Sequence, residues 1–183
     1  MGSLTNYAED ELLDHALGNG AYTPAATLYL ALCTADPTDA ATGASMNECA
    51  DSGGYSRKAI AFAAASSRSI AQDGTVTFDE ATGSQGTVAY WCVVDSGTYG
   101  AGNALAYGAV TPNKDVESGD DNSVASGQVT ITFAAGKVSN YLANTLLDFM
   151  FRNQAFSQPD TYVRAVTVEV TDSDTGSTIT EPS

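Results

Sequence analysis

The chain has 183 residues, and its 22 acidic and 7 basic side chains give it a formal net charge of −15 at pH 7. Proteins bind nucleic acids largely through Lys and Arg contacts to phosphates, so this charge argues against DNA or RNA as a partner, and anionic membrane surfaces are disfavoured for the same reason. Hydrophobic residues make up 43% of the chain and charged residues only 16%, which is typical of a β-rich protein with a core of its own.

The first predicted element is a helix over residues 6–17. Asn6 can cap its N-terminus, and Glu9 lies in the first turn, where the helix dipole favours a carboxylate. Gly18 and Gly20 then supply a stop signal. The apolar face of this helix consists of Ala8, Leu12, Leu13, Ala16 and Leu17.

Short runs with high β propensity follow, separated by residues that favour turns. They lie at residues 27–34, 55–62, 75–78, 87–94, 104–110 and 128–133. Parallel strands would need crossover helices, which this stretch lacks. The fold class is therefore mainly β, with an antiparallel β-sandwich or barrel-like domain after an N-terminal helix.

A second helix-strand unit is predicted beyond this domain. Apolar residues recur at helical spacing over residues 139–153, a strand is expected at 162–170, and the polar tail at 171–183 is expected to fray. Leu142, Leu146, Leu147 and Phe151 form the apolar face of the helix.

This second unit repeats a motif of the first helix. Asn-Tyr followed by Leu-Leu-Asp occurs at residues 6–14 and again at 140–148. We therefore divide the chain into a β-rich domain at residues 1–135 and a partial repeat at 136–183, packed on the same domain or on a neighbouring subunit. The alternative is that two unrelated helices share the motif by chance.

The apolar face of the second helix must be covered, either by the chain's own β-domain or by another subunit. We favour the second and predict that Leu142, Leu146, Leu147 and Phe151 form a partner interface. Truncation after Ala135 would then leave a soluble β-domain that no longer forms its native oligomer.

No pattern of catalytic or metal-binding residues is evident. His15 is the only histidine and lies in an acidic helix, so a surface or packing role is favoured over catalysis. The clusters at residues 117–122 and 172–176 carry oxygen ligands that could hold Ca²⁺, but turn chemistry explains them equally well. We predict no enzymatic activity, no cofactor and no metal.

The three cysteines do not have the spacing of a disulfide framework or a zinc site. Cys33 and Cys92 lie in apolar runs and are expected to pack as small hydrophobes, whereas Cys49 lies in a polar loop. The longest apolar stretches, such as residues 59–65 and 88–94, are too short to cross a bilayer. The first residues lack the basic and apolar regions of a secretory signal, so we expect none.

Two pairs of side chains in the predicted strands have both a structural and a binding interpretation. Tyr90-Trp91 is expected to pack in the core rather than form a stacking platform for a ligand. Arg57-Lys58 is the only adjacent basic pair in the chain and is expected on the solvent side of a strand.

Several motifs resemble a family of virion proteins from tailed bacteriophages. The most specific stretches are NYAEDELLDHALG, LYLALCTADPTD and GGYSRKAI, and the similarity runs in order over about residues 3–135. Members of the family are tail-fibre-like proteins, and some serve as capsid cement or decoration proteins. The family brings no catalytic residues to this sequence.

The resemblance implies a structural protein on the exterior of a phage head that bridges neighbouring capsid subunits, with the major capsid protein as its partner and assembly in the host cytoplasm. A homo-oligomer is expected, with a trimer first, because decoration proteins often occupy threefold positions, and a dimer second. The main alternative is a tail-fibre or tail-tip module that binds a host receptor through its loops. A hydrolase acting on surface polysaccharide ranks third.

Overall fold

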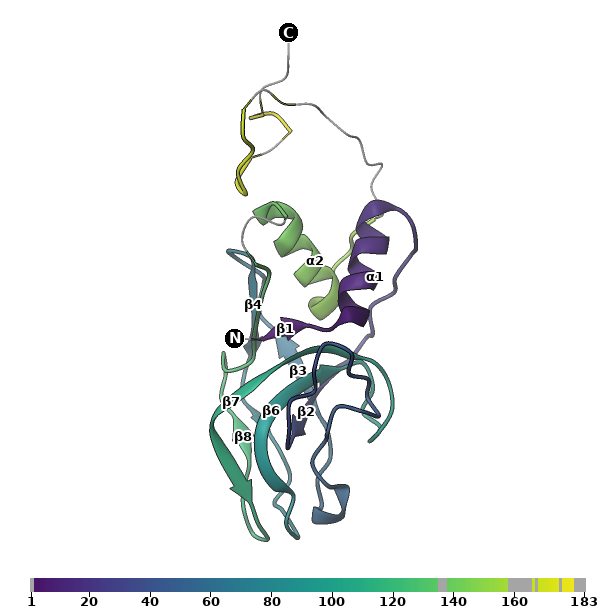
Figure 1. Ribbon diagram of the computed structural model, residues 1–183. Helices are drawn as coiled ribbons and strands as arrows, with labels where there is room; N and C mark the ends of the chain where they lie inside the picture. The colour runs from purple at the N-terminus through teal and green to yellow at the C-terminus, as the bar shows by residue number, and fades with distance from the viewer. Residues whose placement is uncertain (1, 135–137, 158–165, 167, 175, 180–183) are drawn as a thin grey trace.

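A seven-stranded antiparallel sheet curls into a nearly closed barrel, and two α-helices lie over one end of it (Figure 1). The computed structural model describes residues 2–134, 138–157, 166, 168–174 and 176–179. The strand predicted at 162–170 lies largely outside the described residues. The elements are β1 (Ser3–Leu4), α1 (Asn6–Leu17), β2 (Leu28–Cys33), the 3₁₀ helix η1 (Asp51–Gly53), β3 (Lys58–Phe62), β4 (Ser69–Asp73), β5 (Val76–Thr77), β6 (Gly86–Val94), β7 (Ala104–Val116), β8 (Ser123–Val124), β9 (Thr130–Thr132) and α2 (Asn140–Arg152).

The strand order in the barrel is β1-β7-β6-β2-β3-β4-β9, and β5 pairs separately with β8. A parallel bridge between Gly2 and Ile131 joins the two edge strands, and the Gly2 N–H donates to the Thr130 carbonyl at 2.8 Å. Closure leaves few unpaired edge groups. The prediction of a mainly β, antiparallel, barrel-like domain is therefore confirmed.

The six strands predicted in the β-domain each overlap an observed strand, but three observed strands had no signal in the sequence. β1 and β8 have two residues each, and β4 reads Ser-Ile-Ala-Gln-Asp, with polar residues at three of five positions. β7 also runs further than expected, to Val116, where it pairs with Gly86 of β6. Such strands are held by their neighbours in the sheet more than by local propensity.

Trp91 of β6 fixes how closely the N-terminus approaches the barrel. Its ring lies against Gly2 and Gly108, and a Cβ at Gly108 would lie 2.5 Å from Trp91 Cζ2. Trp91 is buried in the main core, and Tyr90 packs against a second, smaller cluster on the other face of the sheet. The expectation of core packing is confirmed for Trp91, which is 3% exposed, whereas Tyr90 is only partly buried.

Both helices begin with the same type of cap. Thr5 is the N-cap of α1 and accepts a hydrogen bond from the Ala8 N–H at 3.3 Å, so the expectation of Asn6 in this role was wrong by one residue. Ser139 caps α2 and accepts from the Leu142 N–H at 3.2 Å. Among the described residues, no helix is both long and apolar enough to span a bilayer.

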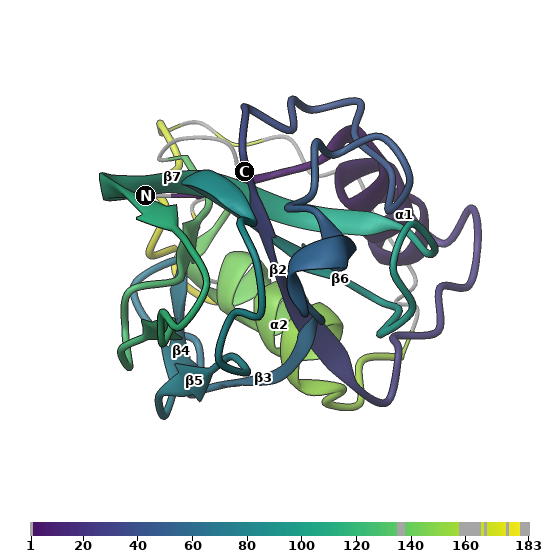
Figure 2. The same cartoon turned by 90° about the horizontal axis from the view of Figure 1, so that it is seen from below.

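The two helices cover one end of the barrel. Seen from below, α2 lies behind the ring of strands (Figure 2). α2 contacts β3 and β4, whereas α1 contacts β7. Where the helices meet, the His15 ring of α1 stacks on the Phe149 ring of α2, with centroids 4.3 Å apart. Side chains of both helices belong to the main hydrophobic core.

Candidate functional site

The predicted partner interface on α2 lies inside the chain's own core. Leu147 is fully buried, Leu146 and Phe151 are 3% and 4% exposed, and Leu142 is partly buried against the same cluster. The prediction that a neighbouring subunit covers this face was wrong, because the chain's own sheet covers it. The Phe62 and Phe151 rings, for example, have centroids 5.3 Å apart.

Polar side chains of α2 reinforce this packing. The Ala65 N–H donates to Asp148 Oδ1 at 2.9 Å, and the Arg68 N–H donates to Asn144 Oδ1 at 2.8 Å. Both donors lie at the turn between β3 and β4, where Ser67 and Arg68 adopt positive φ. α2 therefore satisfies the backbone of a hairpin end that would otherwise leave two N–H groups without a partner in the protein.

His15 has a structural role in this arrangement. It is 6% exposed, its Nε2 lies 2.7 Å from the Phe156 carbonyl oxygen, and its Nδ1 accepts from the Tyr22 N–H at 3.2 Å. The imidazole therefore donates at one nitrogen and accepts at the other, so both ring nitrogens have a partner within the chain. The packing role expected for His15 agrees with this geometry.

Arg57 occupies the centre of a buried polar cluster rather than the solvent side of a strand. Its side chain is 0% exposed, and it forms a bidentate pair with Glu48, with both N–O distances at 2.7 Å. The remaining guanidinium N–H groups donate to the carbonyl oxygens of Ser96, Ala101 and Gly43 at 2.7–2.9 Å. Burial acts to lower the pKa of Arg57, but the hydrogen bond and charge of Glu48 outweigh it and raise that pKa.

Tyr55, two residues earlier in the same motif, completes this cluster. Its hydroxyl donates to Glu48 at 3.0 Å and accepts from the Leu32 N–H at 2.9 Å. Burial and the nearby Glu48 carboxylate raise the pKa of Tyr55. The motif at residues 53–60 thus ties the loops after β2 and after β6 to the barrel.

Lys58 points away from this cluster. It forms an ion pair with Asp79 at 2.5 Å, in which the Asp79 side chain is 63% exposed. Hydrogen bonds from Lys58 and Ser56 lower the pKa of Asp79. Only Lys58 therefore keeps the solvent-facing position expected for both cations, because consecutive residues of an extended strand point to opposite faces.

The acidic clusters are built as turns. Asp120 Oδ2 accepts from the Glu117 N–H at 3.0 Å, and Asp174 Oδ2 accepts from the Thr171 N–H at 2.7 Å. Hydrogen bonds from the N–H and the hydroxyl of Thr171 lower the pKa of Asp174. In the part of the chain that the structure describes, no three His, Cys, Asp or Glu side chains gather to hold a metal ion.

The three cysteines are buried and free. Burial raises the pKa of Cys49 to about 12, and burial opposed by Arg57 leaves that of Cys92 at about 12 as well. Burial raises the pKa of Cys33 further, with added effects from Cys92 and Cys49. Thiols in this state are poor nucleophiles at neutral pH and behave as packing groups, as predicted for Cys33 and Cys92.

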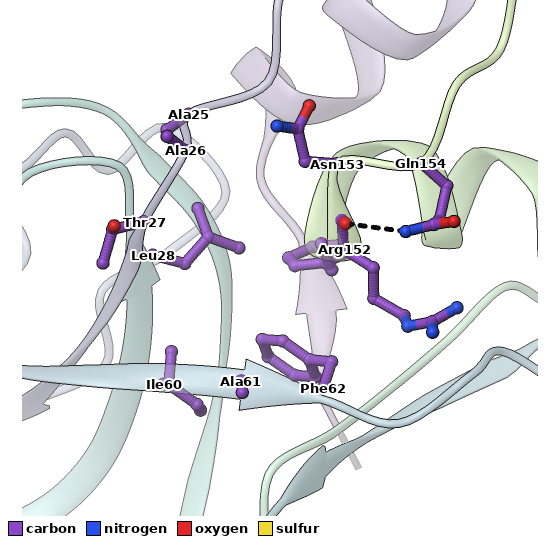
Figure 3. Close-up of a pocket in the computed structure, with 11 residues that line it drawn as sticks. Ala25, Ala26, Thr27, Leu28, Ile60, Ala61, Phe62, Arg152, Asn153 and Gln154 are labelled. Atoms are coloured by element: carbon purple, nitrogen blue, oxygen red, sulfur yellow. Dashed lines mark hydrogen bonds between the residues drawn. The ribbon is translucent and has the colours of Figure 1, made fainter.

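A pocket of about 290 Å³ opens between the segment before β2, strand β3 and the end of α2 (Figure 3). Seven of its eleven lining residues are apolar, including Leu28, Ile60 and Phe62. Arg152 is the charged side chain in the lining, and it pairs with Asp148 at 3.0 Å. The lining has one hydroxyl, that of Thr27, and no carboxylate, cysteine or histidine beside it for acid-base chemistry.

The surface of α1 differs from these buried sites. Leu13 and Leu17 are 52% and 62% exposed, although both were assigned to the apolar face of the helix. The buried side consists of Ala8, Leu12, His15 and Ala16. The sequence did carry a signal for this exposure. The five apolar residues of α1 cover more of the helix circumference than one packed face needs, so some of them had to lie outside that face.

A family model described as "Podophage GP4 fiber I protein gp80" matches residues 3–132 and 137–183. The chain belongs to this family. No curated protein matches it. The expected membership of a bacteriophage virion family is confirmed, and the match also covers most of the segment that the sequence resemblance had left outside.

Membership of the gp80 family makes the chain a fibre-related structural protein of the phage virion. Both helices and the Arg57 cluster lie within the matched residues. Tyr55 and Arg57 belong to GGYSRKAI, one of the three stretches that carry the resemblance, and their polar groups hold loops of the chain itself in place.

Proposed function

We propose that the chain is a capsid decoration protein, a non-catalytic protein that binds the exterior of a phage head and bridges neighbouring capsid subunits. The observation that carries this proposal is the nearly closed build of the chain. The Gly2–Ile131 bridge joins the two edges of the barrel, and two helices cover one end of it. A nearly closed unit of this kind suits a protein that sits over a joint between shell subunits and acts by burying area there.

The charge of the chain supports the same role. A net charge of −15 keeps particles that display the protein from associating with each other and keeps the protein away from DNA. In the described residues the buried ionisable groups are engaged in structural contacts, as the His15 and Arg57 hydrogen bonds illustrate. Contact with the major capsid protein, rather than turnover of a substrate, is the function that we infer.

A second candidate is a tail-fibre or tail-tip module. The family description, which names a fibre protein, favours it. The loop after β2 and the loop after β6 are both bound by Arg57, and loops held in one shape are suited to receptor recognition. Here the loops would bind a host glycan or protein.

The two candidates differ in the place of the protein on the particle. We expect antibodies against the chain to label phage heads in electron micrographs. Labelling confined to fibres or the tail tip would support the second candidate and reject the first. Light scattering on the purified chain would test its assembly, for which we propose a trimer first and a dimer second.

A further inference from the structure

α1 carries an exposed face that matches a buried face of α2. With the two Asn-Tyr motifs aligned, Asp10, Leu13, Asp14 and Leu17 correspond to Asn144, Leu147, Asp148 and Phe151. We call the first four residues the α1 outer face. All four are exposed, whereas Leu147 and Phe151 are buried under β3 and β4.

The matching face of α2 shows what such a face binds. It receives the end of the β3–β4 hairpin, with Asn144 and Asp148 accepting backbone N–H groups at 2.8 and 2.9 Å. Leu147 and Phe151 supply the apolar contact beside these hydrogen bonds. A helix with two acceptors and two apolar side chains at this spacing is therefore a receptor for a hairpin end.

We propose that the α1 outer face docks onto a β-hairpin end of a different protein of the virion, an inference that rests on the proposed structural role. The fold does not account for the apolar character of Leu13 and Leu17, because the helix buries its other side. An apolar pocket of about 300 Å³ adjoins this face, between Leu13 of α1 and Leu146 of α2.

Charge defines the chemistry of the partner. α1 carries Glu9, Asp10, Glu11 and Asp14 and has neither Lys nor Arg. The hairpin that fits therefore presents an apolar side chain, free backbone N–H groups near its turn, and Lys or Arg residues around them.

A second copy of this chain is a poor occupant on two grounds. Two α1 helices meeting face to face would bring their acidic side chains together, which is repulsive. The β3–β4 hairpin of a second copy is already covered by its own α2. The partner is therefore expected to be another virion protein.

The test uses phage particles assembled without this protein and the purified full-length chain, with binding measured by co-sedimentation. We expect the double variant Leu13→Gln/Leu17→Gln to bind about tenfold or more weakly than the wild type. The matched control is Tyr141→Gln, which removes an exposed aromatic residue (73% exposed) from α2, and it should bind like the wild type.

A charge reversal gives a second, independent readout. Asp10→Lys should weaken binding several-fold, and the loss should shrink as salt is raised, because exposed charges are screened. Asp121→Lys changes the net charge equally, on the exposed loop after β7, and should have little effect.

The outcomes separate the two proposals. If the wild type binds the particles and the double variant binds equally well, the α1 outer face is not the docking surface, while the structural role stands. If the wild type does not bind, the proposed function fails and this inference fails with it. If the purified wild type is an oligomer that the double variant converts to a monomer, a second copy occupies the face and the proposal is overturned.

Discussion

The two helices share a motif and a type of cap, yet they bury different surfaces. Leu12 of α1 and Leu146 of α2 are equivalent, and both are nearly fully buried. Leu13 is 52% exposed, but its equivalent Leu147 is fully buried; Leu17 is 62% exposed, but its equivalent Phe151 is 4% exposed. The same sequence pattern therefore gives one packed face in α1 and two in α2.

The difference lies in what the barrel offers each helix. α2 lies against the β3–β4 hairpin, which covers its second face, whereas α1 contacts β7. Packing of α2 thus contributes to the stability of the single chain, whereas the second face of α1 remains available. Helix stability in proteins comes mainly from such tertiary contacts, so substitutions at equivalent positions should have unequal effects.

Removing α2 should produce the largest effect. A chain ending after Ala135 loses six buried side chains of α2, including Leu147 and Met150, and leaves the β3–β4 hairpin uncovered. We now expect it to lack a cooperative thermal transition, because the barrel core depends on α2. A soluble, cooperatively folded truncated chain would contradict this view and restore the interpretation of α2 as an accessory unit.

The next largest difference is expected between substitutions of the equivalent leucines, Leu147 of α2 and Leu13 of α1. Leu147→Gln places an amide in the core and removes packing, and we expect it to lower the free energy of unfolding by about 3–5 kcal/mol. Leu13→Gln should change it by no more than about 0.5 kcal/mol. Urea denaturation measures both, and similar losses for the two variants would contradict the assigned burial.

For the helix N-caps, the larger loss of stability is expected in α1 rather than in α2. Thr5 is buried, and its hydroxyl also donates to the Ala104 carbonyl at 2.6 Å. Thr5→Ala should therefore cost about 2 kcal/mol, from a lost cap and an unpaired buried acceptor. Ser139→Ala should cost about 1 kcal/mol or less. Equal losses in calorimetry would mean that the link from Thr5 to β7 contributes nothing.

The equivalent aspartates should give the smallest difference. Asp148→Ala leaves the Ala65 N–H without its acceptor, and we expect a loss of about 1–2 kcal/mol. Asp14→Ala removes an exposed contact with Asn19 and should cost less than about 0.5 kcal/mol. Amide hydrogen exchange adds a local readout, because only Asp148→Ala should speed exchange at Ala65.

Local sequence patterns predicted both helices well but not what covers them. The spacing of apolar residues and the glycine after Leu17 fix where the helices begin and end, and these are short-range properties. Whether Leu13 or Leu147 becomes buried depends on the position of the β3–β4 hairpin, which is set by strand pairing across the whole barrel. The helical pattern is the same in both cases.

The same limit explains why Arg57 was expected on the solvent side of a strand, although its side chain is buried. Its neighbours alternate as in a strand with one solvent face, which suggested an exposed cation. Its burial depends on Glu48 and on three carbonyl groups from loops distant in sequence. A buried Arg requires such convergent acceptors, and a linear pattern does not reveal them.

A reconstruction of the phage particle by electron cryomicroscopy tests the account most directly. We predict density for the barrel on the exterior of the head, with the α1 outer face turned towards a hairpin of a neighbouring protein and Leu13 and Leu17 in the contact. Density that places the chain on the particle with the α1 outer face open to solvent would contradict the docking proposal, and particles without the chain on the head would contradict its assignment as a decoration protein.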